Sequence, residues 1–367
     1  MSPAPPDRPP PARIVIADST NRYDGRDVAA RPLGGTETSV IQLAEALVRR
    51  GHDVTCYTNT DRRVVHNGVT WAPIGAGGRE TCTVFIAVQH PELFGVVRRP
   101  TRRALWLVWP PSGLRRPART ARMWWYRPSL VFVSEFQARV YPAWLPRPAL
   151  ASVIPFGLPA DVRGRDPLPA SPPPRAIFAS NPQRDLRWLI GLWGRAILPR
   201  VPGAELHIYG IRDYAYRYGE RWEETVTRLG QFVPDDLPAA ARESLKPHPP
   251  APKDQLWAAM RASRLMLYGG HPAEAFCLAV AEAQALGVPA VVRPIGAMPE
   301  RVRPGATGFV TADEGAFADH AAALLTDDRL WRAQHQAALA LQQGWTWDEM
   351  AATFEARVFP RRTGDPA

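Results

Sequence analysis

The sequence predicts an α/β protein built from two doubly wound, Rossmann-like domains. Short apolar strands alternate with amphipathic helices along most of the chain, as in parallel sheets that are covered by helices on both faces. A Pro-rich stretch near mid-chain, residues 155–174, interrupts this alternation, as a boundary between two domains does. The length of 367 residues also suits two domains better than one.

The first domain is predicted to span residues 13–158. Residues 1–12 precede it, are Pro-rich, lack an apolar core and are expected to form a disordered tail. Strands are expected at 13–17, 54–57, 84–88, 104–109 and 130–133, and helices at 36–50 and 135–144. The first helix is the clearest, because Val40, Leu43, Ala44 and Leu47 recur at helical spacing and form one apolar face.

The second domain is predicted to span residues 175–344, after a linker at 159–174. Strands are expected at 176–179, 205–209, 265–268 and 288–292, and helices at 185–197, 222–229, 255–261, 315–325 and 329–343. One more helix begins near Phe276–Leu278 and is stopped by Gly287. A last helix, Trp347–Val358, lies in a C-terminal segment assigned to residues 345–360.

The segment from Tyr268 to Thr311 is the most informative for function. It places Glu274 in a loop and Glu282 in the helix that follows, at the loop end of a strand–loop–helix unit, where open α/β sheets bind ligands. The first N–H groups of that helix are unpaired and suit a phosphate; they belong to Phe276, Cys277 and Leu278. Carboxylates beside such a site suit hydroxyl groups, so the unit predicts a phosphorylated, hydroxyl-rich ligand. The alternative is that both glutamates lie on a solvated helix surface.

These residues resemble the donor-binding motif of GT-B-fold retaining glycosyltransferases of family 4. The resemblance extends to earlier and later motifs in the same order. They are residues 34–37, 153–157, 179–184, 274–282, 287–292, 296–300 and 308–310. The resemblance covers the chain from about Arg13 to Phe359. It implies two Rossmann-like domains facing a cleft, with the acceptor side on the first domain, the nucleotide sugar on the second, and a C-terminal helix that crosses back onto the first domain.

In the second domain, the resemblance implies how the donor is held. Arg184, with the turn residues Ser180 and Asn181, would bind the donor diphosphate, whose charge grows as the glycosidic bond breaks. Glu274 would face the reacting hexose as a catalytic residue, and Glu282 would face the ribose. The motif departs from the family at two positions where glycine is usual, because this chain has Ala275 and Cys277 there.

In the first domain, Gly34 and Gly35 precede a helix and would let the backbone approach a phosphate or sugar; the alternative is an ordinary flexible turn. The polar loop before them, residues 18–33, would lie near the acceptor. His90 follows a strand and is a candidate to hydrogen-bond the transferred sugar or phosphate, or simply a loop histidine that caps a helix. Where the family often has a histidine after a later strand, this chain has Trp109.

Composition limits the cofactors and partners. Three cysteines at unrelated spacings, Cys56, Cys82 and Cys277, predict neither a disulfide framework nor a metal site. The chain has no Asp-x-Asp motif, so we expect a metal-independent enzyme with no cofactor beyond its donor substrate. A reducing cytoplasm is the expected location. The net charge of +10 comes from arginine, with only two lysines, and suits anionic partners.

A basic and aromatic segment, Arg115–Tyr126, is a candidate interaction surface together with Arg98–Arg103. It suits an anionic membrane surface or an acceptor. The alternative is a solvated helix with a buried aromatic face. No helix-turn-helix, zinc or RNA-binding motif accompanies it, so nucleic acid is not an expected partner.

The predicted function is transfer of a hexose from a nucleotide-diphosphate sugar to a hydroxyl acceptor, with retention of anomeric configuration. The acceptor is a glycan, a lipid-linked saccharide or a small molecule. In the resembled family an oxygen of the leaving diphosphate assists the acceptor, so no dedicated protein base is expected. A catalytically inactive GT-B-like protein that binds a nucleotide sugar is the alternative, and a basic nucleic-acid-binding protein is a weaker one.

Overall fold

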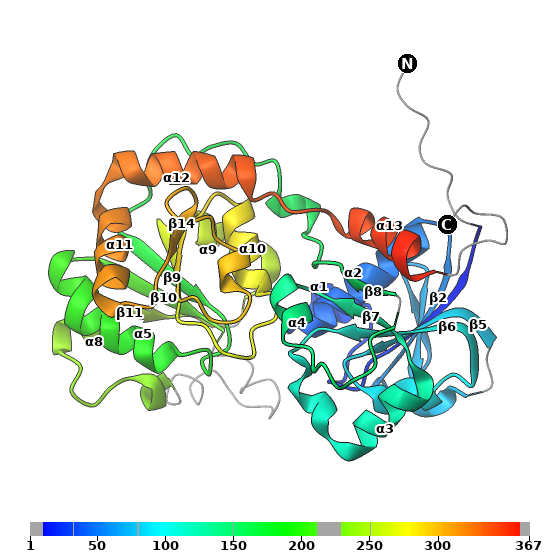
Figure 1. Ribbon diagram of the computed structural model, residues 1–367. Coiled ribbons are helices and arrows are strands. Elements are labelled where there is room, and N and C mark those ends of the chain that lie inside the picture. Colours follow the sequence, from blue (N-terminus) through cyan, green and yellow to red (C-terminus); the bar gives the residue numbers. More distant parts are fainter. Residues whose placement is uncertain are drawn as a thin grey trace. The chain divides into compact units, whose positions relative to one another are not determined.

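The computed structural model describes residues 10–31, 33–78, 81–148, 150–210, 229–249 and 251–359, without the side chain of Ala29. It divides the chain into two compact units. The first unit comprises Met1–Gly157 and Trp345–Ala367, and the second comprises Leu158–Gly344. Each unit contains a largely parallel sheet with helices packed on it, so the predicted α/β class is confirmed (Figure 1).

The sheet of the first unit has the strand order β3-β4-β2-β1-β5-β6-β7-β8 among the described residues. Its strands are β1 (Arg13–Ala17), β2 (Asp53–Thr58), β3 (Val64–His66), β4 (Val69–Pro73), β5 (Thr81–Val88), β6 (Arg99–Leu107), β7 (Ser129–Phe132) and β8 (Ala151–Val153). All neighbours pair in parallel except β3 with β4, which form a hairpin. Its turn is Asn67-Gly68, with positive φ at both residues, as a tight hairpin requires.

The helices of the first unit are α1 (Asp27–Ala30), α2 (Gly35–Arg49), α3 (Pro117–Tyr126), α4 (Glu135–Arg139) and α13 (Trp347–Val358). The helix predicted at 135–144 is wrong in length, because α4 ends at Arg139. Pro142 explains the early end, since the residue before a proline disfavours helical geometry. The strands β3, β4 and β8 and the short helix α1 were not predicted.

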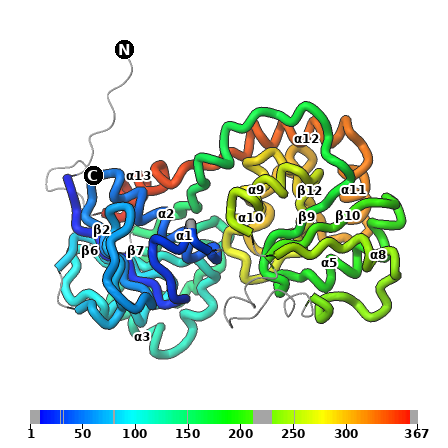
Figure 2. Tube along the Cα trace, turned by 180° about the vertical axis from the view of Figure 1, so that it is seen from behind, coloured from blue at the N-terminus to red at the C-terminus, as the bar shows by residue number. Residues whose placement is uncertain are grey.

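The C-terminal helix α13 belongs to the first unit and packs beside α2, as both views of the chain show (Figures 1 and 2). Thr346 and Glu349 cap its start reciprocally. Near its end Glu355 is buried and accepts hydrogen bonds from Arg50 and His52. Burial alone would raise the pKa of Glu355, but its bonds to His52 and Arg50 hold that pKa below its usual value.

The sheet of the second unit is parallel throughout, with the order β11-β10-β9-β12-β13-β14. Its strands are β9 (Arg175–Ala179), β10 (Glu205–Tyr209), β11 (Leu245–Pro247), β12 (Leu265–Tyr268), β13 (Ala290–Val292) and β14 (Gly308–Val310). Its helices are α5 (Leu186–Leu192), α8 (Ala239–Ser244), α9 (Lys253–Arg261), α10 (Leu278–Ala285), α11 (Glu314–Thr326) and α12 (Asp328–Leu341). The helix predicted at 222–229 lies, except for its last residue, outside the described residues.

The Pro-rich segment 159–174 is bound to the second unit by hydrogen bonds at several points along its length. Arg163 Nε donates to the carbonyl of Gln343 at 2.9 Å, and the N–H of Leu168 donates to His335 Nε2 at 2.9 Å. Arg264 Nε donates to the carbonyl of Pro172 at 2.7 Å. The segment predicted as a linker is therefore anchored on the second unit by its backbone and by the Arg163 side chain.

Candidate active site

In the second unit, two loops at the carboxyl ends of neighbouring strands build the position of Glu274. The loop after β12 carries Glu274, and the loop after β13 supports it through Gly296. The N–H of Ala297 donates to the carbonyl of Glu274 at 3.0 Å. Gly296 has φ +61°, and a Cβ there would lie 2.4 Å from that carbonyl oxygen, so only glycine allows this contact.

Only one of the two carboxylate oxygens of Glu274, Oε2, accepts a hydrogen bond from the described residues. Tyr268, at the end of β12, donates its hydroxyl to Oε2 at 2.5 Å. Burial, and then the nearby groups of Cys277 and Glu274, raise the pKa of Tyr268 well above its usual value, so its hydroxyl stays protonated and donates. None of the described residues donates a hydrogen bond to Oε1 of Glu274, which leaves that oxygen for a ligand hydroxyl.

Arg184 reaches the same carboxylate from the turn after β9, the strand beside β12. Its Nη1 lies 3.6 Å from Oε2 of Glu274. The turn is fixed locally, because the N–H of Arg184 donates to the carbonyl of Asn181 at 2.8 Å and Asn181 Oδ1 accepts from the N–H of Gln183 at 2.9 Å. Ser180 begins the turn, and its carbonyl packs against Gly210, where a Cβ would approach to 2.2 Å.

One guanidinium nitrogen of Arg184 has unmet hydrogen-bonding capacity. Nη1 is buried and has no hydrogen-bond partner among the described residues. A buried donor without a partner is costly, and a ligand acceptor bound beside Nη1 would satisfy it. The structure therefore brings together two of the predicted site residues, Arg184 and Glu274, and the guanidinium of Arg184 suits a phosphate oxygen.

Helix α10 begins at Leu278, within the predicted range, and the residue before it is strained. Cys277 has φ +66°, in the left-handed region that favours glycine, whereas Ala275 does not have positive φ. Burial, and next the charge of Glu274, raise the pKa of the Cys277 thiol, so it stays protonated. Phe276 is buried, and the Arg301 guanidinium lies 4.2 Å from its ring centre.

Glu282 lies one turn into α10, is 1% exposed, and has partners that the sequence did not reveal. Lys253 Nζ donates to Oε1 at 2.7 Å and to Oε2 at 2.8 Å. Trp257 Nε1 donates to Oε2 at 3.1 Å. The interpretation of the two glutamates as solvated helix surface is therefore wrong for Glu282. No motif in the sequence marks Lys253 or Trp257 as a partner of Glu282.

In the first unit, His90 follows β5 and its position is set by Arg119. Arg119 Nη2 lies 3.1 Å from His90 Nδ1, and Arg119 Nε donates to Glu92 at 2.6 Å. A guanidinium only donates hydrogen bonds, so Nδ1 is the acceptor and the proton sits on Nε2. Burial, and then the charge of Arg119, lower the pKa of His90. His90 is thus a neutral imidazole that offers an Nε2–H donor.

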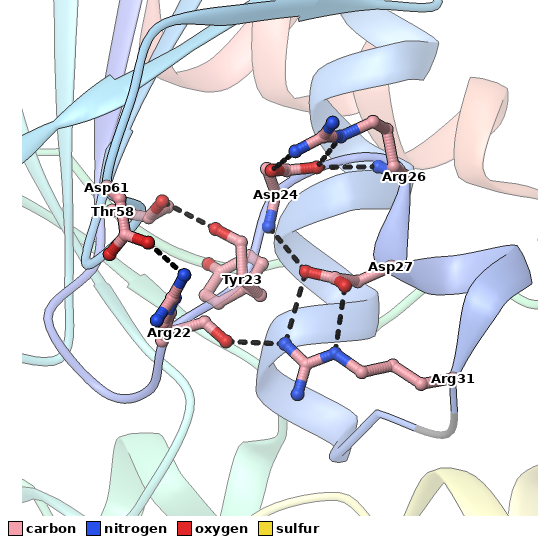
Figure 3. A network of polar contacts seen from close by, with 8 residues as sticks. All are labelled: Arg22, Tyr23, Asp24, Arg26, Asp27, Arg31, Thr58 and Asp61. Atoms are coloured by element: carbon pink, nitrogen blue, oxygen red, sulfur yellow. Dashed lines mark hydrogen bonds and ion pairs between the residues drawn. The ribbon is translucent and has the colours of Figure 1, made fainter.

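The polar loop at residues 18–33, predicted to lie near the acceptor, is stabilised by hydrogen bonds among its own polar groups where it is described (Figure 3). Asp24 accepts from Arg26 at 2.7 Å, and Asp27 accepts from Arg31 at 2.8 Å. Thr58 Oγ1 donates to the carbonyl of Tyr23 at 2.7 Å, which ties the loop to β2. The arginines of this loop are paired with carboxylates, so the loop presents a fixed surface rather than a free cationic one.

Gly34 and Gly35 stand at the start of α2, as predicted, but the backbone of Gly34 is ordinary, with φ −68°. A Cβ on Gly34 would lie 2.4 Å from the Glu37 carboxylate, so the flexible end of that side chain would have to shift to make room for it. Asp18, the first residue of the loop, is fully buried and accepts hydrogen bonds from Thr20 and Tyr23. Burial raises the pKa of Asp18.

The basic and aromatic segment forms α3, and its aromatic residues are not buried together. Trp125 is 82% exposed and Trp124 is 48% exposed, while Met123 is the buried residue of the helix. The alternative of a solvated helix with a buried aromatic face is therefore wrong. The guanidinium of Arg103, by contrast, lies 4.5 Å from the Tyr126 ring centre and makes a cation–π contact with it. None of the helices in the described part of the chain has the length and apolarity to cross a bilayer.

Two family models match this chain, one in each half of the sequence. Residues 241–340 match the family model described as glycosyl transferases group 1, and residues 33–159 match the model described as glycosyltransferase family 4. Together the two matches cover more than half of the chain and contain most of the site residues above. The protein belongs to the group 1 glycosyltransferases with the GT-B fold.

Individual relatives agree with this family. A D-inositol 3-phosphate glycosyltransferase 1 of Catenulispora acidiphila is 32% identical over 180 residues, which span 47% of this chain and 41% of the relative. The match thus spans less than half of that protein.

Solved structures share the fold at low identity. Sucrose-phosphate synthase of Thermosynechococcus elongatus has a TM-score of 0.69 at 15% identity, over 94% of this chain and 97% of that chain. Anabaena HepE, in complex with UDP-glucose, has a TM-score of 0.66 at 16% identity, over 94% and 98%. WaaG, a glycosyltransferase involved in lipopolysaccharide biosynthesis, has a TM-score of 0.66 at 11% identity, over 96% and 100%.

Proposed function

We propose that the protein is a retaining glycosyltransferase that moves a hexose from a nucleotide-diphosphate sugar to a hydroxyl acceptor. The observation that carries this proposal is the arrangement of Arg184 and Glu274 at the carboxyl edge of the second sheet. A buried, incompletely hydrogen-bonded guanidinium suits a diphosphate, and the carboxylate oxygen beside it suits a sugar hydroxyl. One group binds the leaving part of the donor and the other orients the transferred part.

The chemistry follows from where charge develops. As the glycosidic bond breaks, negative charge collects on the diphosphate, and Arg184 stabilises it where it forms. Glu274 Oε1 accepts a hydrogen bond from the hexose and fixes its orientation. His90 offers a neutral N–H donor in the first unit, for the sugar or the acceptor. An oxygen of the departing diphosphate takes the acceptor proton on the same face, which preserves the anomeric configuration without a protein base.

The relatives support the choice of substrates. HepE was solved with UDP-glucose, which makes a uridine-diphosphate hexose the first donor to test. The D-inositol 3-phosphate glycosyltransferase suggests a small polyol acceptor, and WaaG suggests a saccharide carried by a lipid. We propose that transfer needs neither a metal ion nor a further cofactor, because Arg184 and the start of α10 supply the positive field that a divalent cation supplies elsewhere.

We further propose that the enzyme works in the cytoplasm at an anionic membrane surface, through the first unit. The support is α3, where the exposed Trp124 and Trp125 follow Arg122 and precede Arg127, the residue that ends the helix. Exposed tryptophans and arginines are the residue types that favour the interface of a bilayer.

The experiment begins with a panel of nucleotide sugars read by thermal shift, since a ligand bound to the folded state raises its stability by mass action. The donors that bind are then offered hydroxyl acceptors, and the product is examined by mass spectrometry and by NMR for its anomeric configuration. Transfer with retention, in the presence of a chelator, is the expected result. Binding without transfer or hydrolysis would favour the catalytically inactive alternative, and no binding by any nucleotide sugar would refute the proposal.

A further inference from the structure

We propose that Lys253 recognises the ribose of the donor together with Glu282, Lys253 donating to one ribose hydroxyl and Glu282 accepting from the other. This inference rests on the proposed function and assigns a residue to it that no motif contains. The two side chains come from different helices: Lys253 is the first residue of α9, and Glu282 lies in α10. Both helices follow strands of the same parallel sheet, so their N-terminal ends face its carboxyl edge.

The hydrogen-bonding capacity of Glu282 is nearly used up in the free protein. A carboxylate offers about four lone-pair positions. Lys253 occupies one on each oxygen, and Trp257 occupies a second one on Oε2. One position remains, on Oε1. Glu282 alone therefore has no room for both hydroxyls of a ribose, and a second group must serve the other one.

Lys253 has the complementary capacity. An ammonium group carries three N–H donors, and two of those of Lys253 point to Glu282. Among the described residues, no further acceptor lies within hydrogen-bond distance of its Nζ. The pair thus offers one acceptor and one donor side by side, which matches a vicinal diol, where each hydroxyl both donates and accepts.

The burial of the pair shows where a ligand approaches. The Glu282 side chain is 2% exposed, whereas that of Lys253 is 35% exposed. The open side of the pair is therefore the lysine side, and Trp257 fixes the carboxylate from another direction. A site built to pair with hydroxyls rejects an analogue that lacks them, because its own polar groups are then left unpaired.

Lys246 provides a matched control, since it is the one other lysine of the chain. It lies 3.7 Å from Glu205, whose side chain is 38% exposed, and it donates to the carbonyl of Glu243 at 2.9 Å. Its removal changes the net charge as the removal of Lys253 does, but it leaves Glu282 and Trp257 in place.

The test measures the affinity of UDP, GDP and ADP, and of their 2′-deoxy and 3′-deoxy forms, by calorimetry. For the wild type, we expect the best ribonucleotide to bind at least about 10-fold more tightly than one of its deoxy forms, as for a hydrogen bond to a charged group. In Lys253→Met this ratio should fall to about 3-fold or less, through weaker binding of the ribonucleotide. Lys246→Met should keep the wild-type ratio.

A second variant guards against misfolding, because Lys253→Met leaves a buried carboxylate unpaired. The double variant Lys253→Met/Glu282→Gln removes both charges, and it should fold and lose the discrimination between ribose and deoxyribose. If either folded variant binds a ribonucleotide with the full wild-type ratio, the role of Lys253 is refuted. If the wild type binds none of the three nucleotides at millimolar concentration, the proposed function fails instead.

Discussion

Nη1 of Arg184 lies 3.6 Å from Oε2 of Glu274, within range of an ion pair but too far for a good hydrogen bond. The same nitrogen is buried without a hydrogen-bond partner among the described residues. The carboxylate therefore offsets the charge of the guanidinium but leaves a donor open. A guanidinium in this position can pair with a second anion, such as a phosphate, without giving up Glu274.

Replacing Glu274 with Gln is expected to reduce turnover much more than donor affinity. The substitution keeps the shape of the side chain but removes the charge that orients the hexose. We expect kcat/KM to fall by about 10- to 150-fold, the equivalent of about 1.5–3 kcal/mol for a hydrogen bond to a charged group. Asp319→Asn, on the exposed face of α11, is the control for loss of one carboxylate. Wild-type kinetics for Glu274→Gln would refute the catalytic role.

Replacing Arg184 with Ala is expected to lower both kcat and donor affinity, because its contact with the diphosphate strengthens as the leaving group departs. Arg184→Lys should restore part of the activity, since lysine supplies the charge without the planar pair of donors. Steady-state kinetics with the best donor measure both effects. A change in KM alone for Arg184→Ala would mean that the contact is the same in the ground state and in the transition state.

The pairing of His90 with Arg119 predicts a shift in the pH dependence of activity. The lowered pKa of His90 keeps its imidazole neutral down to a pH below the ordinary value of about 6.5. Activity that needs the neutral form is therefore lost only as pH falls through the lowered pKa. In Arg119→Met the pKa of His90 should rise, so the acid limb of the pH–activity profile should move to higher pH. Three other charged groups act on His90 in both proteins: Glu92 and Asp18 raise its pKa, and Arg116 lowers it.

NMR titration of the His90 ring measures the same shift without activity. Arg122→Met, on the same helix, is the control, because Arg122 Nη1 donates only to the carbonyl of Ala118. An unchanged His90 titration in Arg119→Met would remove Arg119 from this role.

The left-handed backbone of Cys277 predicts an unusual order of stabilities. Glycine in a helix or strand is normally less stable than alanine by about 0.5–1 kcal/mol. At φ +66° the order should reverse, so Cys277→Gly should be more stable than Cys277→Ala by about 1 kcal/mol. Ala275→Gly serves as the control with ordinary backbone and should be destabilised. Chemical denaturation measures the three free energies of unfolding, and an alanine variant as stable as the glycine variant would exclude the strain.

Binding to a membrane is expected to depend on the exposed tryptophans of α3. Trp125→Ser and Arg122→Gln should each reduce sedimentation with anionic liposomes, because one removes apolar contact and the other about 1 kcal/mol of attraction. Binding should also weaken as salt is raised, because charges are screened over about 10 Å at 0.1 M. Val65→Ser, an exposed apolar residue on β3, should have no effect. Equal, negligible pelleting of the wild type with anionic and neutral liposomes would leave a soluble acceptor as the better hypothesis.

The sequence predicts correctly those strands and helices whose apolar spacing and flanking turn residues lie within one short segment. Strands such as β10 and β12 and the helix α13 begin and end at the predicted residues, because their apolar spacing and flanking turns are complete within the segment. The strands β3, β4, β8, β11 and β14 were not predicted. Four of them, β3, β8, β11 and β14, have three residues each, which is too few for a periodicity of their own. The Asn67-Gly68 pair was the available signal for the hairpin of β3 and β4.

The candidate site was predictable only in part, because its partners are distant in sequence. Glu274, Arg184 and Glu282 stand in recognisable motifs, but Lys253 and Trp257 lie outside them and meet Glu282 only through the packing of α9 on α10. In the same way, nothing in the local sequence of His90 reveals Arg119, which is 29 residues away. The strain at Cys277 also needed the backbone angle, since the sequence showed only that a glycine is absent.

The return of α13 to the first unit has a consequence for the order of synthesis. The ribosome completes residues 158–344 before it makes the helix that supplies Glu355 to Arg50 and His52. The aromatic surface of Trp106 and Phe156, which Phe354 and Trp347 cover, therefore stays open on the nascent chain until the whole second unit has emerged. The second unit is continuous in sequence and can fold as it appears, whereas the first unit is finished last, although it is begun first.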